Sequence, residues 1–261
     1  MSVETLSMIE LVLQTAMLIT LIILTARLMA RVEFSPLVAF FTIGKASILL
    51  SDLYWIAFIL LESEARMPFA VNEIGECAGI LLLATAMRSQ LSDAPNRDLI
   101  DILPPALFTL CNVALWIAWS GEWVQDIMSG LALGYYLVIA SRLLRQEAAL
   151  TQPEKLVLGA VAILLVVLQG LTFAVGAAVR SILDVVCTGM MALSILFFFA
   201  KSIIALRRGS VAALPLTFGG FGWTLVCLYM SAGAPYLIIA LCVTLCFLLM
   251  YQAVKGRVMA A

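Results

Sequence analysis

Residues 156–177 read LVLGAVAILLVVLQGLTFAVGA, twenty-two residues in a row without a charged side chain. A helix needs about 20 apolar residues to cross the roughly 30 Å hydrocarbon core of a bilayer. A second run of similar length, residues 181–205, follows at once, so 51 residues separate Lys155 from Arg207. That is too long for one spanning helix and right for two. The stretch predicts two consecutive membrane helices with a break near Gly176 to Arg180.

The composition of the whole chain extends this interpretation. Of its 261 residues, 64% are apolar and 12% are charged, and the mean hydropathy is +1.12. Ordinary soluble domains are about 45–50% apolar and about 25% charged. We therefore expect an all-helical integral membrane protein, and neither a soluble globule nor a disordered chain.

Several function classes are disfavoured by the residues that are scarce. The net charge is −1, so we expect no basic patch that follows nucleic acid. The chain has no histidine, the commonest general base and transition-metal ligand. Its six cysteines lie in apolar runs without C-x-x-C spacing, so we interpret them as packing residues. We expect no metal and no cofactor. The six are Cys77, Cys111, Cys187, Cys227, Cys242 and Cys246.

Nine apolar runs near the spanning length are separated by charges, Pro or Gly, and they predict a bundle of about nine helices. Residues 1–10, where the first run begins, carry two glutamates and no Lys or Arg, which is typical of a transmembrane helix rather than a signal peptide. The nine are Leu6–Met29, Leu37–Leu61, Phe69–Ala86, Ile102–Trp119, Trp123–Ala140, Leu156–Ala177, Ser181–Ala205, Val211–Met230 and Pro235–Ala253.

The cationic residues predict the orientation, because short loops rich in Lys and Arg stay cytoplasmic. Nine spans place twelve of the fifteen on one side, which puts the N-terminus outside and the C-terminus in the cytoplasm. We expect the bacterial cytoplasmic (plasma) membrane. The longest loops, Ser89–Asp101 and Ser141–Lys155, have 13 and 15 residues, so residues 1–261 form a single transmembrane domain. The twelve are Arg27, Arg31, Arg88, Arg97, Arg142, Arg145, Lys155, Lys201, Arg207, Arg208, Lys255 and Arg257.

After the first span the chain reads as four hairpins that resemble one another, a possible fourfold repeat. Each of three descending spans opens with an acid and ends at a base 15, 16 or 17 residues later: Glu73 and Arg88, Asp126 and Arg142, Asp184 and Lys201. The alternative is that any protein with many spans and cytoplasmic arginines looks periodic. G-x-x-x-G spacing at Gly75/Gly79 and Gly130/Gly134 predicts that the third and fifth spans are central packing helices.

Four ionisable residues in the second and third spans are the main site candidates. A charge near mid-bilayer costs at least about 2.5–3.5 kcal/mol, so each needs a purpose or a partner. At 1.5 Å per residue, Lys45 lies roughly 12 Å and Asp52 roughly 22 Å from the cytoplasmic end of the second span. Glu73 and Glu76 lie roughly 6 and 10 Å from the outer end of the third. Asp52 and Glu76 are therefore expected at nearly the same level.

The functional hypothesis is an acidic cavity that opens to the outside. Asp52 and Glu76 would bind a proton or cation, Lys45 would lie at the floor, and Asn72 and Trp55 would line it. Two carboxylates in a low-dielectric site cannot both ionise easily, so one is expected to carry a proton near neutral pH.

The structural alternative is an ion pair of Lys45 with Asp52 or Glu76 that fixes helix packing, with Glu73 in the headgroup zone. One lysine cannot neutralise three carboxylates, which favours the functional hypothesis. Secondary candidates are Asn112, Gln169, Asp126 and Asp184. Interhelical hydrogen bonding would explain the two amides, and Gln14 with them.

Three functions follow from these features. The first is a small transporter or permease coupled to protons or cations, whose partners are the bilayer and a small solute. The second is a sensor or receptor that binds an extracytoplasmic ligand in the same cavity, with an oligomer or signalling contact through the third and fifth spans. The third, an intramembrane enzyme with Asp52 and Asp184 as an aspartyl pair, lacks any catalytic motif, so we expect no enzyme.

The orientation is tested by single cysteines introduced at Ser2 and Ala260. A membrane-impermeant thiol reagent should label them from opposite sides of the membrane, because nine passes separate them. Labelling of both from one side would contradict the odd number of spans.

Overall fold

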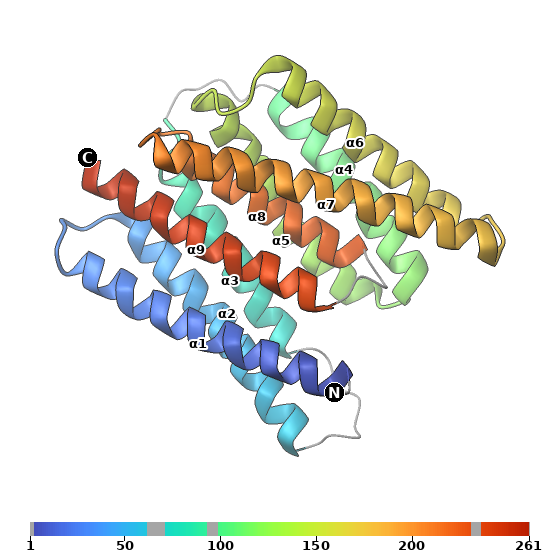
Figure 1. The fold of residues 1–261 in the computed structure, drawn as a ribbon, viewed down its shortest axis with the longest axis horizontal. Coiled ribbons are helices and arrows are strands. Elements are labelled where there is room, and N and C mark those ends of the chain that lie inside the picture. Colours follow the sequence, from blue (N-terminus) through green and yellow to red (C-terminus); the bar gives the residue numbers. More distant parts are fainter. Residues whose placement is uncertain (1–2, 62–70, 93–98, 231–235, 261) are drawn as a thin grey trace.

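The computed structural model describes residues 3–61, 71–92, 99–230 and 236–260. Within these ranges the chain forms nine helices and no strand, and each predicted span corresponds to one helix (Figure 1). The helices are α1 (Val3–Met29), α2 (Pro36–Leu61), α3 (Val71–Arg88), α4 (Leu99–Ser120), α5 (Trp123–Gln146), α6 (Gln152–Thr172), α7 (Ala177–Arg207), α8 (Ala213–Met230) and α9 (Tyr236–Ala260).

Seven of these helices are long and apolar enough to cross a membrane, which indicates an integral membrane protein. The other two are α3, which has 18 residues and carries Glu73 and Glu76, and α8, whose described apolar part is Ala213–Leu228. The two ends of the chain lie at opposite ends of the bundle (Figure 1). The count of nine spans, their orientation and the fourfold repeat stay predictions.

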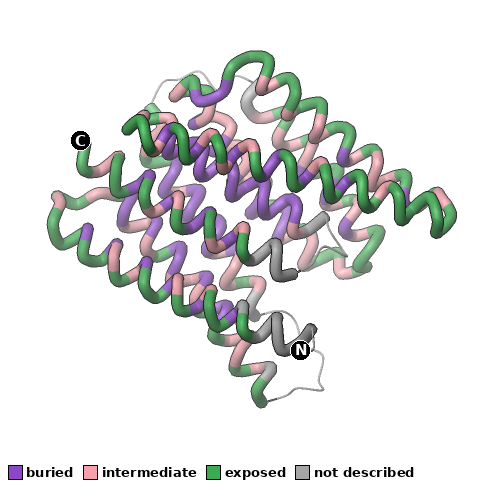
Figure 2. Tube along the Cα trace, in the orientation of Figure 1, coloured by how far each residue is buried: buried purple, intermediate pink, exposed green. Residues whose placement is uncertain are grey.

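The helices pack around a central group formed by α3, α5 and α8. Helix α2 covers α3, and α1 packs on α2 and α9. On the other side α4 packs on α5, while α6 and α7 form a peripheral hairpin that contacts α4, α8 and α9. Buried residues follow the middle of this arrangement, whereas α6 is mostly exposed (Figure 2). Lipid is the natural cover for such apolar exposed faces.

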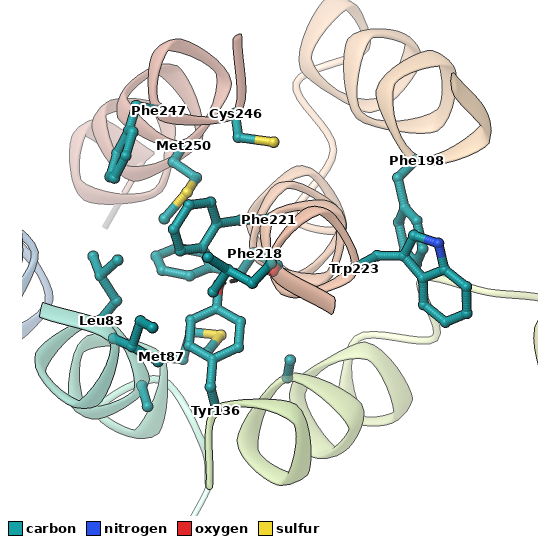
Figure 3. Packing of buried hydrophobic residues seen from close by; sticks show 14 of the residues in the cluster. Leu83, Met87, Tyr136, Phe198, Phe218, Phe221, Trp223, Cys246, Phe247 and Met250 are labelled. Carbon is teal, nitrogen blue, oxygen red and sulfur yellow. Dashed lines mark hydrogen bonds between the residues drawn. The ribbon is translucent and has the colours of Figure 1, made fainter. Parts of the chain in front are cut away.

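Aromatic residues of α8 form the centre of the core (Figure 3). The Phe221 ring packs edge-on against Tyr136 of α5 at 5.8 Å and lies 5.1 Å from the Phe247 ring of α9. The buried Tyr136 hydroxyl donates a 2.8 Å hydrogen bond to the Phe218 carbonyl oxygen. This bond gives the phenol a partner in the interior, where an unpaired hydroxyl is costly.

Small residues bring α2 and α3 close together. A Cβ atom at Gly79 would overlap Ile48 and lie 3.0 Å from the Gly44 carbonyl oxygen, and one at Gly75 would lie 3.2 Å from the Ser51 Cβ. The prediction that Gly75 and Gly79 form a helix contact is therefore confirmed. Gly130 and Gly134 face Val113 and Thr109 of α4 in the same way. Both glycine pairs are thus used within the chain.

The break between α6 and α7 comes slightly earlier than predicted. Helix α6 ends at Thr172 and α7 already begins at Ala177, after the extended residue Gly176. Arg180, placed at the edge of the predicted break, lies in the first turn of α7. Its Nε donates a 2.9 Å hydrogen bond to the Thr172 carbonyl oxygen, one of the carbonyls that a helix end leaves without an intrahelical partner.

Polar contacts join three helices at the end of the bundle that is predicted to be cytoplasmic. Arg257 of α9 forms a 2.9 Å ion pair with Glu147, directly after α5. Its Nε also donates to the Gln90 side chain at 3.3 Å, after α3. Gln146 of α5 donates to the Gln90 carbonyl oxygen at 3.1 Å. The ends of α3, α5 and α9 are therefore connected.

Replacing Gly79 with Leu should destabilise the protein by about 1–3 kcal/mol, because the new side chain overpacks the contact with Ile48 and Gly44. Thermal unfolding in detergent measures the effect. Gly159→Leu is the matched control, since a Cβ atom at Gly159 in α6 meets nothing within 4 Å. Equal melting temperatures of the two variants would contradict the close α2–α3 contact.

Candidate functional site

Asp52 is buried in α2 and faces α1. The Gln14 side-chain amide of α1 donates a 3.1 Å hydrogen bond from Nε2 to Asp52 Oδ2. Gln14 is an interhelical hydrogen-bonding residue, as expected, and its partner is the main candidate of the site. The N-terminal helix is thus in direct contact with the Asp52 carboxyl group.

Glu76 of α3 approaches α2 from the other side. The Ser51 hydroxyl lies 3.4 Å from Glu76 Oε1 as a hydrogen-bond donor, and the Ser47 hydroxyl donates to the Gly75 carbonyl oxygen at 2.8 Å. These contacts are possible because Gly75 has no side chain to keep the helices apart. The prediction that the acids of α2 and α3 lie at the same level agrees with this geometry, since Asp52 directly follows Ser51.

Four acidic residues on three helices, which we call the row, are Asp52 of α2, Glu76 and Glu73 of α3, and Asp126 of α5. When they are ionised, Asp52 and Glu76 repel each other, and Glu73 repels both Glu76 and Asp126 of α5. Among the described residues, no Lys or Arg forms an ion pair with any of these four. Like charges in a low-dielectric region destabilise one another. Binding a proton at one of them relieves this repulsion.

Neutral polar groups extend the row toward α5. The Cys77 thiol of α3 lies 3.8 Å from the Ser129 hydroxyl, and the Ser120 hydroxyl donates a 2.6 Å hydrogen bond to Asp126. Asp126, a secondary candidate, therefore joins the row through Glu73. No group of three or more Cys, Asp or Glu side chains among the described residues is arranged to hold a metal ion.

Lys45 lies elsewhere than expected. Its side chain is fully buried between α2 and α1, where Nζ donates to the Leu21 carbonyl oxygen at 3.0 Å and to Thr25 Oγ1 at 3.1 Å. The predicted ion pair of Lys45 with Asp52 or Glu76 is therefore not formed. In a helix the Cα–Cβ bond tilts toward the N-terminus, so Lys45 extends toward Phe41 and away from Asp52.

The remaining candidates are more scattered. Trp55 is half-buried in α2, one turn after Asp52, while Asn72 lies in α3 with its side chain outside the described part. Asn112 is buried in α4 and donates to the Phe108 carbonyl oxygen at 2.7 Å. Gln169 and the exposed Asp184 belong to the α6–α7 hairpin, which packs on α4, α8 and α9. The structure does not bring these last three to the row.

Sequence reasoning missed the small polar residues of α2. Ser47 and Ser51 are four residues apart and Gly44 comes one turn earlier, so all three share one face of the helix. That spacing matches the Gly75 and Gly79 face of α3 and was a usable signal. The role of Gln14 had no such signal, because sequence alone does not tell which helix neighbours α1.

No family model, curated protein or solved structure is found to match this chain.

The contact between Gln14 and Asp52 is tested by a double-mutant cycle. Gln14→Leu and Asp52→Leu, which removes the acceptor, should show a coupling energy of about 0.6–1.7 kcal/mol, the range measured for hydrogen bonds between membrane helices. Unfolding in mixed detergent gives the free energies. Gln14→Leu combined with Glu33→Gln, a change in the exposed loop before α2, should be additive. Additivity in both cycles would contradict the contact.

Proposed function

We propose that this chain is a small membrane transporter that couples the movement of a solute to protons at Asp52 and Glu76. The observation that carries the proposal is the row of carboxylates across α2, α3 and α5, which has no ion-pair partner among the described residues. Acidic residues kept inside membrane segments at this cost mark proton relays and ion pathways. Packing alone does not require ionisable side chains, which are energetically costly inside a membrane.

Proton exchange at Asp52 and Glu76 would change the hydrogen bonds that these residues accept from α1 and α2. Asp52 accepts from Gln14 of α1, and Glu76 accepts from Ser51 of α2. An ionised carboxylate holds a hydrogen-bond donor more strongly than a neutral acid does. Protonation at Asp52 would therefore loosen α1, and deprotonation would tighten it. This is the coupling between charge and helix position that a transporter requires.

A sensor is the second candidate, and one set of contacts favours it. Helix α1, which holds Asp52 through Gln14, also packs on α9. Helix α9 carries Arg257, which contacts Glu147 and Gln90 at the far end of the bundle. A change in the protonation of Asp52 would thus be connected, through α1 and α9, to the end of the bundle where Arg257 lies. Proton binding without any flux would favour this function.

The transporter is tested in proteoliposomes loaded with a pH-sensitive dye and energised by a potassium diffusion potential, inside negative. Na⁺, a mixture of amino acids and a mixture of sugars serve as probes. We expect one of them to accelerate internal acidification. Glu76→Gln should reduce the accelerated rate to that of protein-free vesicles, because the variant keeps the shape of the side chain and loses the exchangeable proton.

Glu33→Gln is the matched control, since it makes the same chemical change at an exposed loop position. Its flux should equal that of the unmodified protein. The proposal fails if no probe changes the proton flux, or if Glu76→Gln transports as fast as the control.

A further inference from the structure

Lys45 is the one cationic side chain that the structure buries completely within the described residues. The proposed transport step does not use it, and it forms no ion pair with the carboxylates of the row. A lysine in this position must be neutral or have partners for an ammonium group. Its contacts distinguish these two states.

The surroundings of Lys45 match an ammonium group with three hydrogens. Nζ donates one hydrogen to the Leu21 carbonyl oxygen at an N–O distance of 3.0 Å and a second to Thr25 Oγ1 at 3.1 Å. The third faces the ring of Phe41, whose centroid lies 4.3 Å from Nζ. The Thr25 hydroxyl donates its own hydrogen to the Leu21 carbonyl oxygen at 2.9 Å, so its oxygen is free to accept from Lys45. A neutral amine has two N–H groups and one lone pair, so with both oxygens as acceptors its lone pair would face the electron-rich Phe41 ring, which attracts an ammonium group instead.

The carboxylate pair lies within electrostatic reach of this group. Lys45 and Asp52 are seven residues apart on one face of α2, about 10 Å along the helix axis. In a low-dielectric interior a charge acts over such a distance without contact. Helix α1 faces this side of α2 with Gln14, Leu21 and Thr25, which are neutral. Helix α3 faces the other side with Glu76, next to Glu73 and Cys77.

We propose that Lys45 is a fixed positive charge that limits the Asp52–Glu76 pair to one exchangeable proton. The inference deepens the proposed function and rests on it for its biological meaning. With Lys45 charged, the three groups are neutral when the pair holds one proton and carry one negative charge when it holds none. Without Lys45, neutrality requires two protons. The charge thus sets a stoichiometry of one proton per cycle.

Infrared spectroscopy of the purified protein in detergent tests this inference without any transport. Protonated carboxyl groups give a separate C=O band, which is assigned to the pair by its loss in Asp52→Asn and Glu76→Gln. Lys45→Met should increase the band at neutral pH by about one carboxyl group per protein. Lys45→Arg keeps the charge and should leave the band unchanged. Lys255→Met, at an exposed position of α9, is the matched control.

Lys45→Gln covers the case in which Lys45→Met does not fold, because its amide keeps two N–H donors for Leu21 and Thr25 while removing the charge. If neither folds, Lys45→Met/Asp52→Asn restores the charge balance, and its folding supports the inference while its failure overturns it. A folded neutral variant with an unchanged band also overturns it. Absence of flux in proteoliposomes, with the infrared change present, would refute only the transporter.

Discussion

The close approach of α2 and α3 is the constraint on which the site depends. Gly44, Gly75 and Gly79 bring the two backbones so close that an added Cβ atom would be tightly packed at Gly44 or Gly75 and would overlap Ile48 at Gly79. At this separation the Ser47 hydroxyl reaches a carbonyl oxygen of the opposite helix, and Ser51 reaches Glu76. Two acidic side chains are thereby held at one level in a region where water is scarce. A wider spacing would let each carboxylate find its own solvation, and the mutual repulsion would weaken.

The buried lysine and the carboxyl groups of the row have different kinds of partners. The Lys45 amino group has two oxygen acceptors, one of them a backbone carbonyl oxygen, and lies over the face of an aromatic ring. The carboxylates have neutral donors and one another. A buried charge with complete hydrogen bonding is a static feature, whereas like charges kept together remain sensitive to ionisation. In the proposed function, α2 thus carries a charge with a structural role at Lys45 and a proton-exchanging group at Asp52.

Hydropathy predicted each helix, because membrane spans have a length fixed by the bilayer. Most ends agree to within five residues, whereas α5 and α9 extend six and seven residues beyond their predicted ends. The close packing of α3 on a neighbouring helix followed from glycine spacing. The level shared by Asp52 and Glu76 followed from the helical rise. The partner of Lys45 did not follow, since spacing indicates a shared face but not the direction in which a long side chain extends. The neighbours of α1 depend on how the whole bundle closes, which no local pattern encodes.

The contacts at the far end of α3, α5 and α9 also limit how the molecule can change shape. Arg257, Glu147, Gln146 and Gln90 connect these three helices near one end, through an ion pair and hydrogen bonds. Helices that move as rigid rods and are joined at one end rotate about that end. Small rotations there become the largest displacements at the opposite tips, where Asp126 and Glu73 lie. Glu73 and Asp126 therefore lie at the ends of α3 and α5 that are farthest from these contacts.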